Sequence, residues 1–360
     1  MNFPTVALDA RLIGGTSTGD STYWTGLLYG MARIQPESKI LLFSNAQPPP
    51  NIPESPSFQW IHLPSKNARW WSMVRFPLAA RRAGAVAIHT QYSLSPLVGR
   101  AGFTTIHDVS FFIGPEWFKP KDRFVLQRTV PAAVRRAKGV FCVSETGRRE
   151  LEGFVPAAKG KTHVTFNACP PWIQRVERSA AKESVRKHLG LELPYLLTVG
   201  TRWPRKNMEL AVKAAERLDA RFPHRLAITG KAGWGDQAVG SRALSTGYVS
   251  NELLSALYSA ADLYLAPSRH EGFGVPVLEA FRCACPVLSS SGGALPEVVD
   301  GAGVVERSWQ PEQWAQTIEG LLEDSSKLES LRRDGLKREE EFTWEETARR
   351  TLGAYFGATS

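Results

Sequence analysis

Hydrophobic and polar positions along the first half of the chain form short β-rich runs separated by amphipathic stretches. The runs predict strands, and the stretches, whose apolar residues recur at helical spacing, predict helices. We expect strands at residues 6–8, 40–43, 60–63, 86–89, 104–107, 140–143 and 163–166, and helices at 19–33, 68–83 and 123–137. Strands and helices in alternation are typical of a parallel sheet covered by helices on both sides.

The second half repeats this alternation after a break at Pro170-Pro171. We expect strands at 195–199, 226–229, 247–249, 263–266, 287–289 and 304–305, helices at 207–222, 251–260 and 275–283, and a long helical tail at 311–356. The polar, charged stretch at 174–188 between the halves is typical of a linker that leads into a helix. The predicted organisation is α/β: a Rossmann-like domain at 1–172, a linker at 173–190, a second Rossmann-like domain at 191–340, and a C-terminal helix at 341–360 that packs back on the first.

Length and composition agree with two globular domains on either side of a cleft. A chain of 360 residues is too long for one ordinary core. With 43% hydrophobic and 22% charged residues, it contains no apolar run near the about 18 residues that cross a bilayer. The N-terminal residues lack the basic and apolar regions of a signal peptide. We therefore expect a cytoplasmic protein.

The net charge of +9 is compatible with nucleic acid, an anionic membrane or phosphorylated small molecules as partners. Many of the basic residues alternate with apolar ones at helical intervals, which solvated helix faces explain. Since no nucleic-acid-binding module is recognisable, we expect no nucleic acid partner. The four cysteines lie in no metal-binding spacing and are interpreted as buried reduced thiols.

Ligands in doubly wound sheets bind beyond the carboxyl ends of the strands, so the loops there are the candidate sites. The first such loop, residues 200–207, begins with Gly200 and ends with the basic pair Arg205 and Lys206 before a helix. Arginine can bind phosphate oxygens with two donors and lysine supplies a compact charge, so a diphosphate is the expected ligand. An exposed basic turn capped by Asn207 is the alternative.

A second loop and the start of the following helix, residues 267–279, carry two carboxylates at informative positions. Glu271 lies in the loop and Glu279 about one turn into the following helix, so both can face the same cleft. Gly272 and Gly274 flank Phe273 and allow the backbone to approach a ligand closely. The pair is suited to accept hydrogen bonds from the hydroxyls of an extended ligand, although a loop carboxylate and an exposed helix residue would give the same pattern.

These motifs resemble a known family. Pro-Arg-Lys-Asn at 204–207, Glu-Gly-Phe-Gly-x-Pro-x-Leu-Glu-Ala at 271–280 and Gly-Gly-Ala-Leu-Pro-Glu at 292–297 are similar to motifs of the retaining family 4 glycosyltransferases, which have the two-domain GT-B fold. The segments 105–110, 115–118 and 143–145 resemble the acceptor domain of the bacterial mannosyl- or rhamnosyltransferase-like branch that builds surface polysaccharides.

The resemblance implies a role for each matching residue. Glu271 would bind the hydroxyls of the donor hexose, Glu279 the nucleotide ribose, and Arg205 with Lys206 the leaving diphosphate. His107 would approach the sugar from the acceptor domain, with a buried core histidine as the alternative. Further donor contacts would come from Gly19, Gly200, Tyr248, Val249, Gly272, Phe273, Gly274 and Val275.

The chain has no Asp-x-Asp pair to hold a metal with a sugar nucleotide, so the basic pair should replace the metal and no cofactor is expected. It also lacks a G-x-G-x-x-G motif after a strand, a Walker A loop and an H-E-x-x-H motif, which argues against a dehydrogenase, an NTPase and a metalloprotease.

We expect hexosyl or deoxyhexosyl transfer, with retention, from a nucleoside diphosphate sugar to a glycan or lipid-linked acceptor. Residues 66–76 mix aromatic with basic side chains, which fits either a segment resting on the inner face of a membrane or a core helix. Where many relatives carry Gly-Ile-Gly-Arg-Tyr, this chain has Gly-Asp-Ser-Thr-Tyr at 19–23. That departure leaves a non-catalytic sugar-nucleotide-binding protein as the alternative function.

Overall fold

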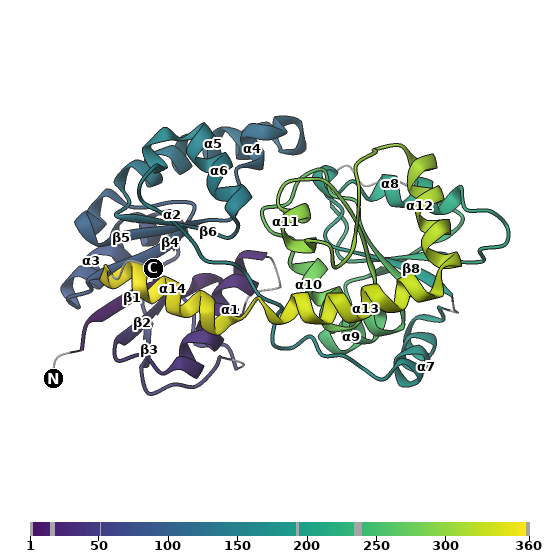
Figure 1. Cartoon of the computed structure of the whole chain (residues 1–360). Coiled ribbons are helices and arrows are strands. Elements are labelled where there is room, and N and C mark those ends of the chain that lie inside the picture. The colour runs from purple at the N-terminus through teal and green to yellow at the C-terminus, as the bar shows by residue number, and fades with distance from the viewer. Residues whose placement is uncertain (1–2, 15–18, 51, 192–193, 234–239, 358–360) are drawn as a thin grey trace. The chain divides into compact units, whose positions relative to one another are not determined.

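The computed structural model describes residues 3–14, 19–50, 52–191, 194–233 and 240–357, and the chain divides into two compact units (Figure 1). Unit 1 consists of Met1–Ala168 and Thr343–Ser360, and unit 2 is Cys169–Phe342. Within the ranges just given, no helix is both long and apolar enough to span a bilayer.

Unit 1 is built on a seven-stranded parallel sheet with the strand order β3-β2-β1-β4-β5-β6-β7. Its strands are β1 Thr5–Asp9, β2 Lys39–Ser44, β3 Phe58–His62, β4 Ala87–Gln91, β5 Gly102–Ile106, β6 Gly139–Cys142 and β7 Thr162–Val164. Its α-helices are α1 Gly19–Ile34, α2 Ala68–Trp70, α3 Phe76–Arg82, α4 Ser110–Ile113, α5 Pro120–Arg136, α6 Glu145–Phe154 and α14 Trp344–Phe356. The central strands are buried on both sides, as the continuous apolar runs indicate.

The C-terminal helix α14 packs along α1 in unit 1 (Figure 1). Two glycines of α1 make this close approach possible, because a Cβ atom at Gly26 would lie 2.1 Å from the Trp344 ring and one at Gly30 only 1.9 Å from the Trp344 carbonyl oxygen. Farther along α14, the Tyr355 hydroxyl lies 2.5 Å from Nδ1 of His89, in the core. Residues 358–360 of the expected C-terminal helix lie outside the described residues.

Unit 2 is built on a six-stranded parallel sheet with the order β10-β9-β8-β11-β12-β13. Its strands are β8 Tyr195–Val199, β9 Arg225–Thr229, β10 Ala243–Gly247, β11 Leu263–Ala266, β12 Val287–Ser290 and β13 Val304–Glu306. Its α-helices are α7 Arg178–Leu189, α8 Met208–Glu216, α9 Asn251–Ala260, α10 Val275–Arg282, α11 Leu295–Val299, α12 Pro311–Glu323 and α13 Ser325–Glu340. The strand order reverses between β8 and β11, which is where ligands bind in doubly wound sheets.

Two segments differ from the sequence-based expectation. Residues 173–190, expected to be a linker, contain helix α7, which belongs to unit 2 and buries Ala181 and Val185 as it packs against α9. The long helical tail expected at 311–356 consists of three helices, because Asp324 and Thr343 each cap a new helix N-terminus. Short polar side chains at those two positions compete with helix continuation, which the hydrophobic periodicity alone did not reveal.

Candidate active site

The loops that follow β8 and β11 lie at the strand-order reversal of unit 2. In the first, Gly200 has a φ of 142°, and the chain continues through the short 3-10 helix η6 Pro204–Lys206. Asn207 then adopts the left-handed conformation and donates its side-chain amide to the Pro267 carbonyl at 3.2 Å. A second hydrogen bond connects the two loops: the backbone N–H of Arg269, in the loop after β11, donates to the Arg205 carbonyl at 2.8 Å. The two predicted motif loops are therefore tied together through their backbones.

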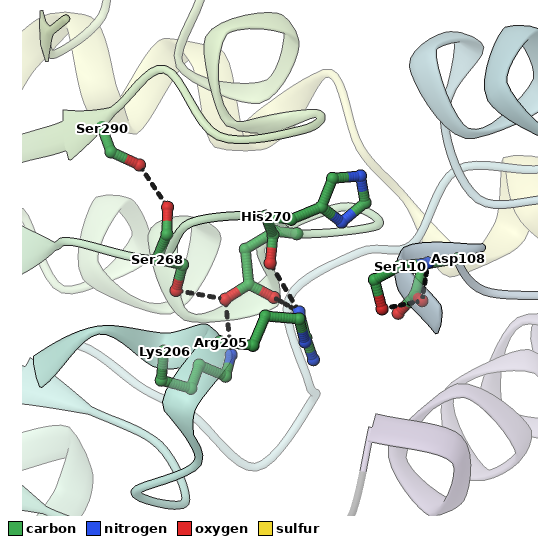
Figure 2. Close-up of polar contacts among 8 residues, drawn as sticks. Asp108, Ser110, Arg205, Lys206, Ser268, His270 and Ser290 are labelled. Carbon is green, nitrogen blue, oxygen red and sulfur yellow. Dashed lines mark hydrogen bonds and ion pairs between the residues drawn. The ribbon is translucent and has the colours of Figure 1, made fainter. Parts of the chain in front are cut away.

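The side chains of these loops meet at Glu271. Lys206 Nζ lies 2.6 Å from Oε1 of Glu271, and Nη1 of Arg205 lies 3.0 Å from Oε2 (Figure 2). The three side chains are between 11% and 16% exposed. Burial alone would raise the pKa of Glu271, but the charges of Lys206 and Arg205 outweigh it and hold the pKa at about 2. Glu271 is therefore a carboxylate at any physiological pH.

Two serines that the sequence interpretation did not single out support this carboxylate. The Ser268 hydroxyl donates to Oε1 of Glu271 at 2.5 Å, and the Ser290 hydroxyl donates to the Ser268 carbonyl at 2.5 Å (Figure 2). Ser268 lies in the same loop, three residues before Glu271, so its contact with the carboxylate could have been predicted from the sequence. Nothing in the sequence pairs Ser290 with this loop, because that contact depends on β11 and β12 being neighbours.

The loop at residues 291–294, which contains the start of the Gly-Gly-Ala-Leu-Pro-Glu motif, packs closely against the Glu271 loop. A Cβ atom at Gly292 would lie 2.4 Å from the Ser268 carbonyl oxygen, and one at Gly293 would lie 2.3 Å from the carbonyl oxygen of Glu271. The backbone N–H of Ala294 donates to that same Glu271 carbonyl at 2.9 Å. Glycine is required here so that one backbone can approach another.

Glu279 has a different environment. It lies on α10 with 9% exposure, and its Oε2 accepts a hydrogen bond from the buried Tyr258 hydroxyl at 2.8 Å. Burial is the dominant influence on the pKa of Glu279 and raises it to about 7, although the Tyr258 hydrogen bond and the Lys206 charge act in the opposite direction. The two glutamates thus have pKa values on opposite sides of the ordinary one.

A pocket of unit 2 opens at this point of the sheet. It lies between the ends of β8 and β11 and the start of α10, and its lining includes Thr198, Lys206, Ser268, Glu271, Gly274 and Leu295. It therefore contains both a cation and a carboxylate from the cluster.

The other predicted donor residues of unit 2 lie around these loops. The Phe273 ring is buried edge-on against Phe342, so only the backbone of this residue remains for a ligand. Gly272 is buried beside it, and Gly274, with a φ of 107°, precedes Val275, the first residue of α10.

Tyr248 and Val249 come directly after β10. Tyr248 is 58% exposed, and the Lys231 ammonium lies 5.3 Å from the centre of its ring. The Tyr248 ring is thus an accessible aromatic surface beside a positive charge.

His107 and Gly19 belong to unit 1. His107 follows β5 and is buried, and its Nε2 is 3.7 Å from a carboxylate oxygen of Asp20. Burial lowers the pKa of His107, whereas the charges of Asp20 and Asp108 act to raise it. Gly19 is the first residue of α1, and residues 15–18 before it lie outside the described part of the chain. Asp108 accepts hydrogen bonds from the backbone and hydroxyl of Ser110 (Figure 2).

The aromatic and basic stretch at 66–76 divides between surface and core. Trp70 is 55% exposed, but Trp71 is buried and stacks on Phe76 with ring centres 5.1 Å apart. Only part of the stretch is therefore available to a membrane surface. All four cysteines are buried free thiols. Among the side chains that the structure describes, no group of three or more His, Cys, Asp or Glu residues is placed to hold a metal ion.

Comparisons with known proteins connect this geometry to a family. Residues 193–324 match the family model described as glycosyl transferases group 1. The O-antigen chain mannosyltransferase B of Escherichia coli is 33% identical over 266 residues, which cover 70% of this chain and 69% of that protein. The chain belongs to the group 1 glycosyltransferases. This is family 4, a family of retaining hexosyltransferases, so the resemblance stated from the motifs is confirmed.

Two further comparisons define the extent of the similarity. The serotype-specific mannosyltransferase WbdA of Escherichia coli is 26% identical over 60% of this group 1 glycosyltransferase, which spans only 28% of WbdA. The crystal structure of Anabaena Alr3699/HepE in complex with UDP and glucose superposes with a TM-score of 0.73 at 16% identity, covering 99% of this chain and 100% of that one. The predicted GT-B fold with two Rossmann-like parts is thereby confirmed.

Proposed function

We propose that this glycosyltransferase moves a hexosyl or deoxyhexosyl unit from a nucleoside diphosphate sugar to a hydroxyl group of a glycan or lipid-linked acceptor, with retention of the anomeric configuration. The observation that carries the proposal is the buried cluster of Glu271, Arg205 and Lys206 at the strand-order reversal of unit 2. It brings fixed cations and a permanent carboxylate together beside a pocket.

Each member of the cluster has a chemical task in this reaction. Arg205 and Lys206 place fixed positive charge where the departing diphosphate develops negative charge, which lowers the barrier without reorganisation. Glu271 accepts hydrogen bonds from the sugar hydroxyls, and Glu279 accepts them from the ribose. Backbone amides of the segment from Gly272 to Val275 line the donor, the Tyr248-Val249 segment receives the base, and His107 of unit 1 approaches the sugar.

Mannose is the first donor sugar to test, and a surface polysaccharide is the first product to examine. Both relatives from Escherichia coli are mannosyltransferases, and one is named for the O-antigen chain. The proposed location is peripheral, at the inner face of the membrane where a lipid-linked acceptor is presented. Co-sedimentation with anionic liposomes at low salt tests it, and a chain that stays in the supernatant would contradict it.

We further propose that transfer needs no metal ion, because Arg205 and Lys206 supply the positive charge for the diphosphate. Transfer rates in EDTA and in added magnesium should then agree within about twofold. A complete loss of activity in EDTA that magnesium restores would overturn metal independence.

The test of the function is transfer from radiolabelled GDP-, UDP- and dTDP-sugars to lipid-linked and free glycan acceptors. The wild-type chain should transfer one of these sugars, and Glu271→Ala should abolish transfer while retaining the circular dichroism spectrum of the folded protein. Binding of a sugar nucleotide without turnover on any acceptor would favour the non-catalytic alternative. Unchanged activity in Glu271→Ala would contradict the assignment of the site.

A further inference from the structure

The carboxylate of Glu271 already holds the two cations that the diphosphate requires. Its Oε1 is 2.6 Å from Lys206 Nζ, and its Oε2 is 3.0 Å from Nη1 of Arg205 (Figure 2). The Ser268 hydroxyl adds a third donor at 2.5 Å. Each carboxylate oxygen of Glu271 therefore already accepts a hydrogen bond from a cation, and Oε1 accepts a second one from Ser268.

The backbone around the cluster holds these groups in place. Arg205 Nη1 also donates to the His270 carbonyl at 2.6 Å, and the Arg205 carbonyl accepts the Arg269 N–H. The carbonyl of Glu271 is fixed by Ala294. Because the loop itself is held from both sides, the Glu271 carboxylate and the cations separate by rotation of side chains and not by movement of the loop.

Burial makes the competition between anions strong. The side chains of Glu271, Arg205 and Lys206 are at most 16% exposed, so water screens their charges only weakly. Each charge is therefore stabilised mainly by its ion-pair partner. A diphosphate that binds Arg205 and Lys206 must share these cations with Glu271 or displace it. Either outcome costs free energy, since two anions then lie against one pair of cations.

We propose that Glu271 is an internal counter-ion that competes with the diphosphate, so that the site favours the intact sugar nucleotide over the nucleoside diphosphate left after transfer. This inference rests on the proposed function. A sugar nucleotide brings the hydroxyls of its hexose, which can donate to the displaced carboxylate. A nucleoside diphosphate has lost the hexose and keeps only the hydroxyls of its ribose, which the proposed function places at Glu279. The product is therefore bound less tightly than its diphosphate contacts alone would allow, and its release is faster.

The test uses Glu271→Gln, which keeps the size of the side chain and removes its charge. Binding of inorganic pyrophosphate, GDP and UDP is measured by isothermal titration calorimetry on the full chain. The variant should bind pyrophosphate about tenfold more tightly than the wild type, which is within the usual range of coupling between two ligands. It should also lose most of the preference of the wild type for the sugar nucleotide over the matching diphosphate.

Glu209→Gln is the matched control. Glu209 lies on α8, is 42% exposed and pairs with Lys213 at 2.5 Å, so its substitution makes the same change in net charge away from the cluster. Pyrophosphate affinity should stay within twofold of the wild type. If Glu271→Gln is poorly folded, Glu271→Asp withdraws the carboxylate from both cations by one methylene group and should increase pyrophosphate affinity severalfold.

The outcomes separate this inference from the proposed function. If the wild type transfers sugar but a folded Glu271 variant binds pyrophosphate no more tightly, the counter-ion inference is wrong and the function stands. If neither the wild type nor the variants bind pyrophosphate and no sugar is transferred, both are wrong. An equal gain in Glu209→Gln would also overturn the inference, because the effect would then be one of net charge.

Discussion

The hydroxyl of Tyr258 donates a hydrogen bond to the Oε2 atom of Glu279 at 2.8 Å, inside unit 2. In the described part of the chain, this is the one side-chain hydrogen bond that reaches the Glu279 carboxylate. Glu271, eight positions earlier, has three donors and a pKa of about 2, whereas the pKa of Glu279 is about 7. Near neutral pH, Glu271 is thus fully ionised whereas Glu279 titrates, so only substitutions that affect Glu279 should change the pH dependence in this range.

Tyr258→Phe should weaken donor binding. Loss of the hydroxyl removes an interaction that lowers the pKa of Glu279, so this pKa rises further and the carboxyl group is neutral at pH 7. We expect the KM for the donor to rise about three- to tenfold with little change in kcat, because the ribose is remote from the reacting bond. The acidic limb of the kcat/KM profile should move to higher pH.

Tyr195→Phe is the control for this substitution. The buried Tyr195 hydroxyl donates to the Leu257 carbonyl of α9 at 2.7 Å, so its loss affects the same helix without touching Glu279. It should lower thermal stability without moving the pH profile. Identical pH profiles for Tyr258→Phe, Tyr195→Phe and the wild type would show that Tyr258 has only a structural role.

Glu279→Gln should stabilise the fold more at high pH than at low pH. A pKa raised from the ordinary 4.5 to about 7 means that the folded chain holds this proton more tightly than the unfolded chain. The associated stability is fully present below pH 4.5 and is lost as the pH rises through about 7. Glutamine does not titrate, so the variant does not lose this stability. The difference in free energy of unfolding, variant minus wild type, should therefore increase by up to ~3 kcal/mol between about pH 5 and pH 8. Urea denaturation at both pH values measures it, and a constant difference would contradict the raised pKa.

Lys206→Ala should reduce diphosphate affinity and turnover together. The substitution removes one of the two cations and leaves Glu271 with a weaker partner set, so kcat should fall about 10²- to 10³-fold, as for the loss of one preorganised electrostatic group. Lys213→Ala on α8 removes an equal charge from an exposed ion pair and should leave kcat within twofold. Steady-state kinetics of both variants measure these changes in kcat. A similar decrease in kcat in both variants would show that the effect comes from the net charge.

Much of the candidate site of unit 2 could be predicted from the sequence because its motifs occupy loops after adjacent parallel strands. Glu271, Arg205 and Lys206 were identified in this way, and the structure brings all three together. The pairing itself was not foreseen, because a basic pair and a carboxylate in separate loops can each be read as a ligand contact. Their mutual neutralisation depends on the contact between the loops, which only tertiary structure supplies.

Tyr258 was not predicted for a different reason. It lies within α9, where an aromatic residue at helical spacing indicates a core position, and it is indeed buried. Its hydroxyl has a second role that hydrophobic periodicity cannot reveal. The extent of helix α7 was likewise not predicted, because only Ala181 and Val185 on its surface are buried, which is too weak a pattern to separate a helix from a polar linker.

Gly30→Ala should destabilise unit 1 strongly, although alanine is the better helix former. A Cβ atom at this position of α1 would lie 1.9 Å from the carbonyl oxygen of Trp344, so α14 must move away from α1 to admit it. We expect a loss of about 1–3 kcal/mol or more in the free energy of unfolding. At the exposed Gly320 of α12, a Cβ atom meets nothing within 4 Å, so Gly320→Ala should instead stabilise by about 0.5–1 kcal/mol. Chemical denaturation of both variants measures the two effects, and a gain in both would show that α14 does not hold α1 at this distance.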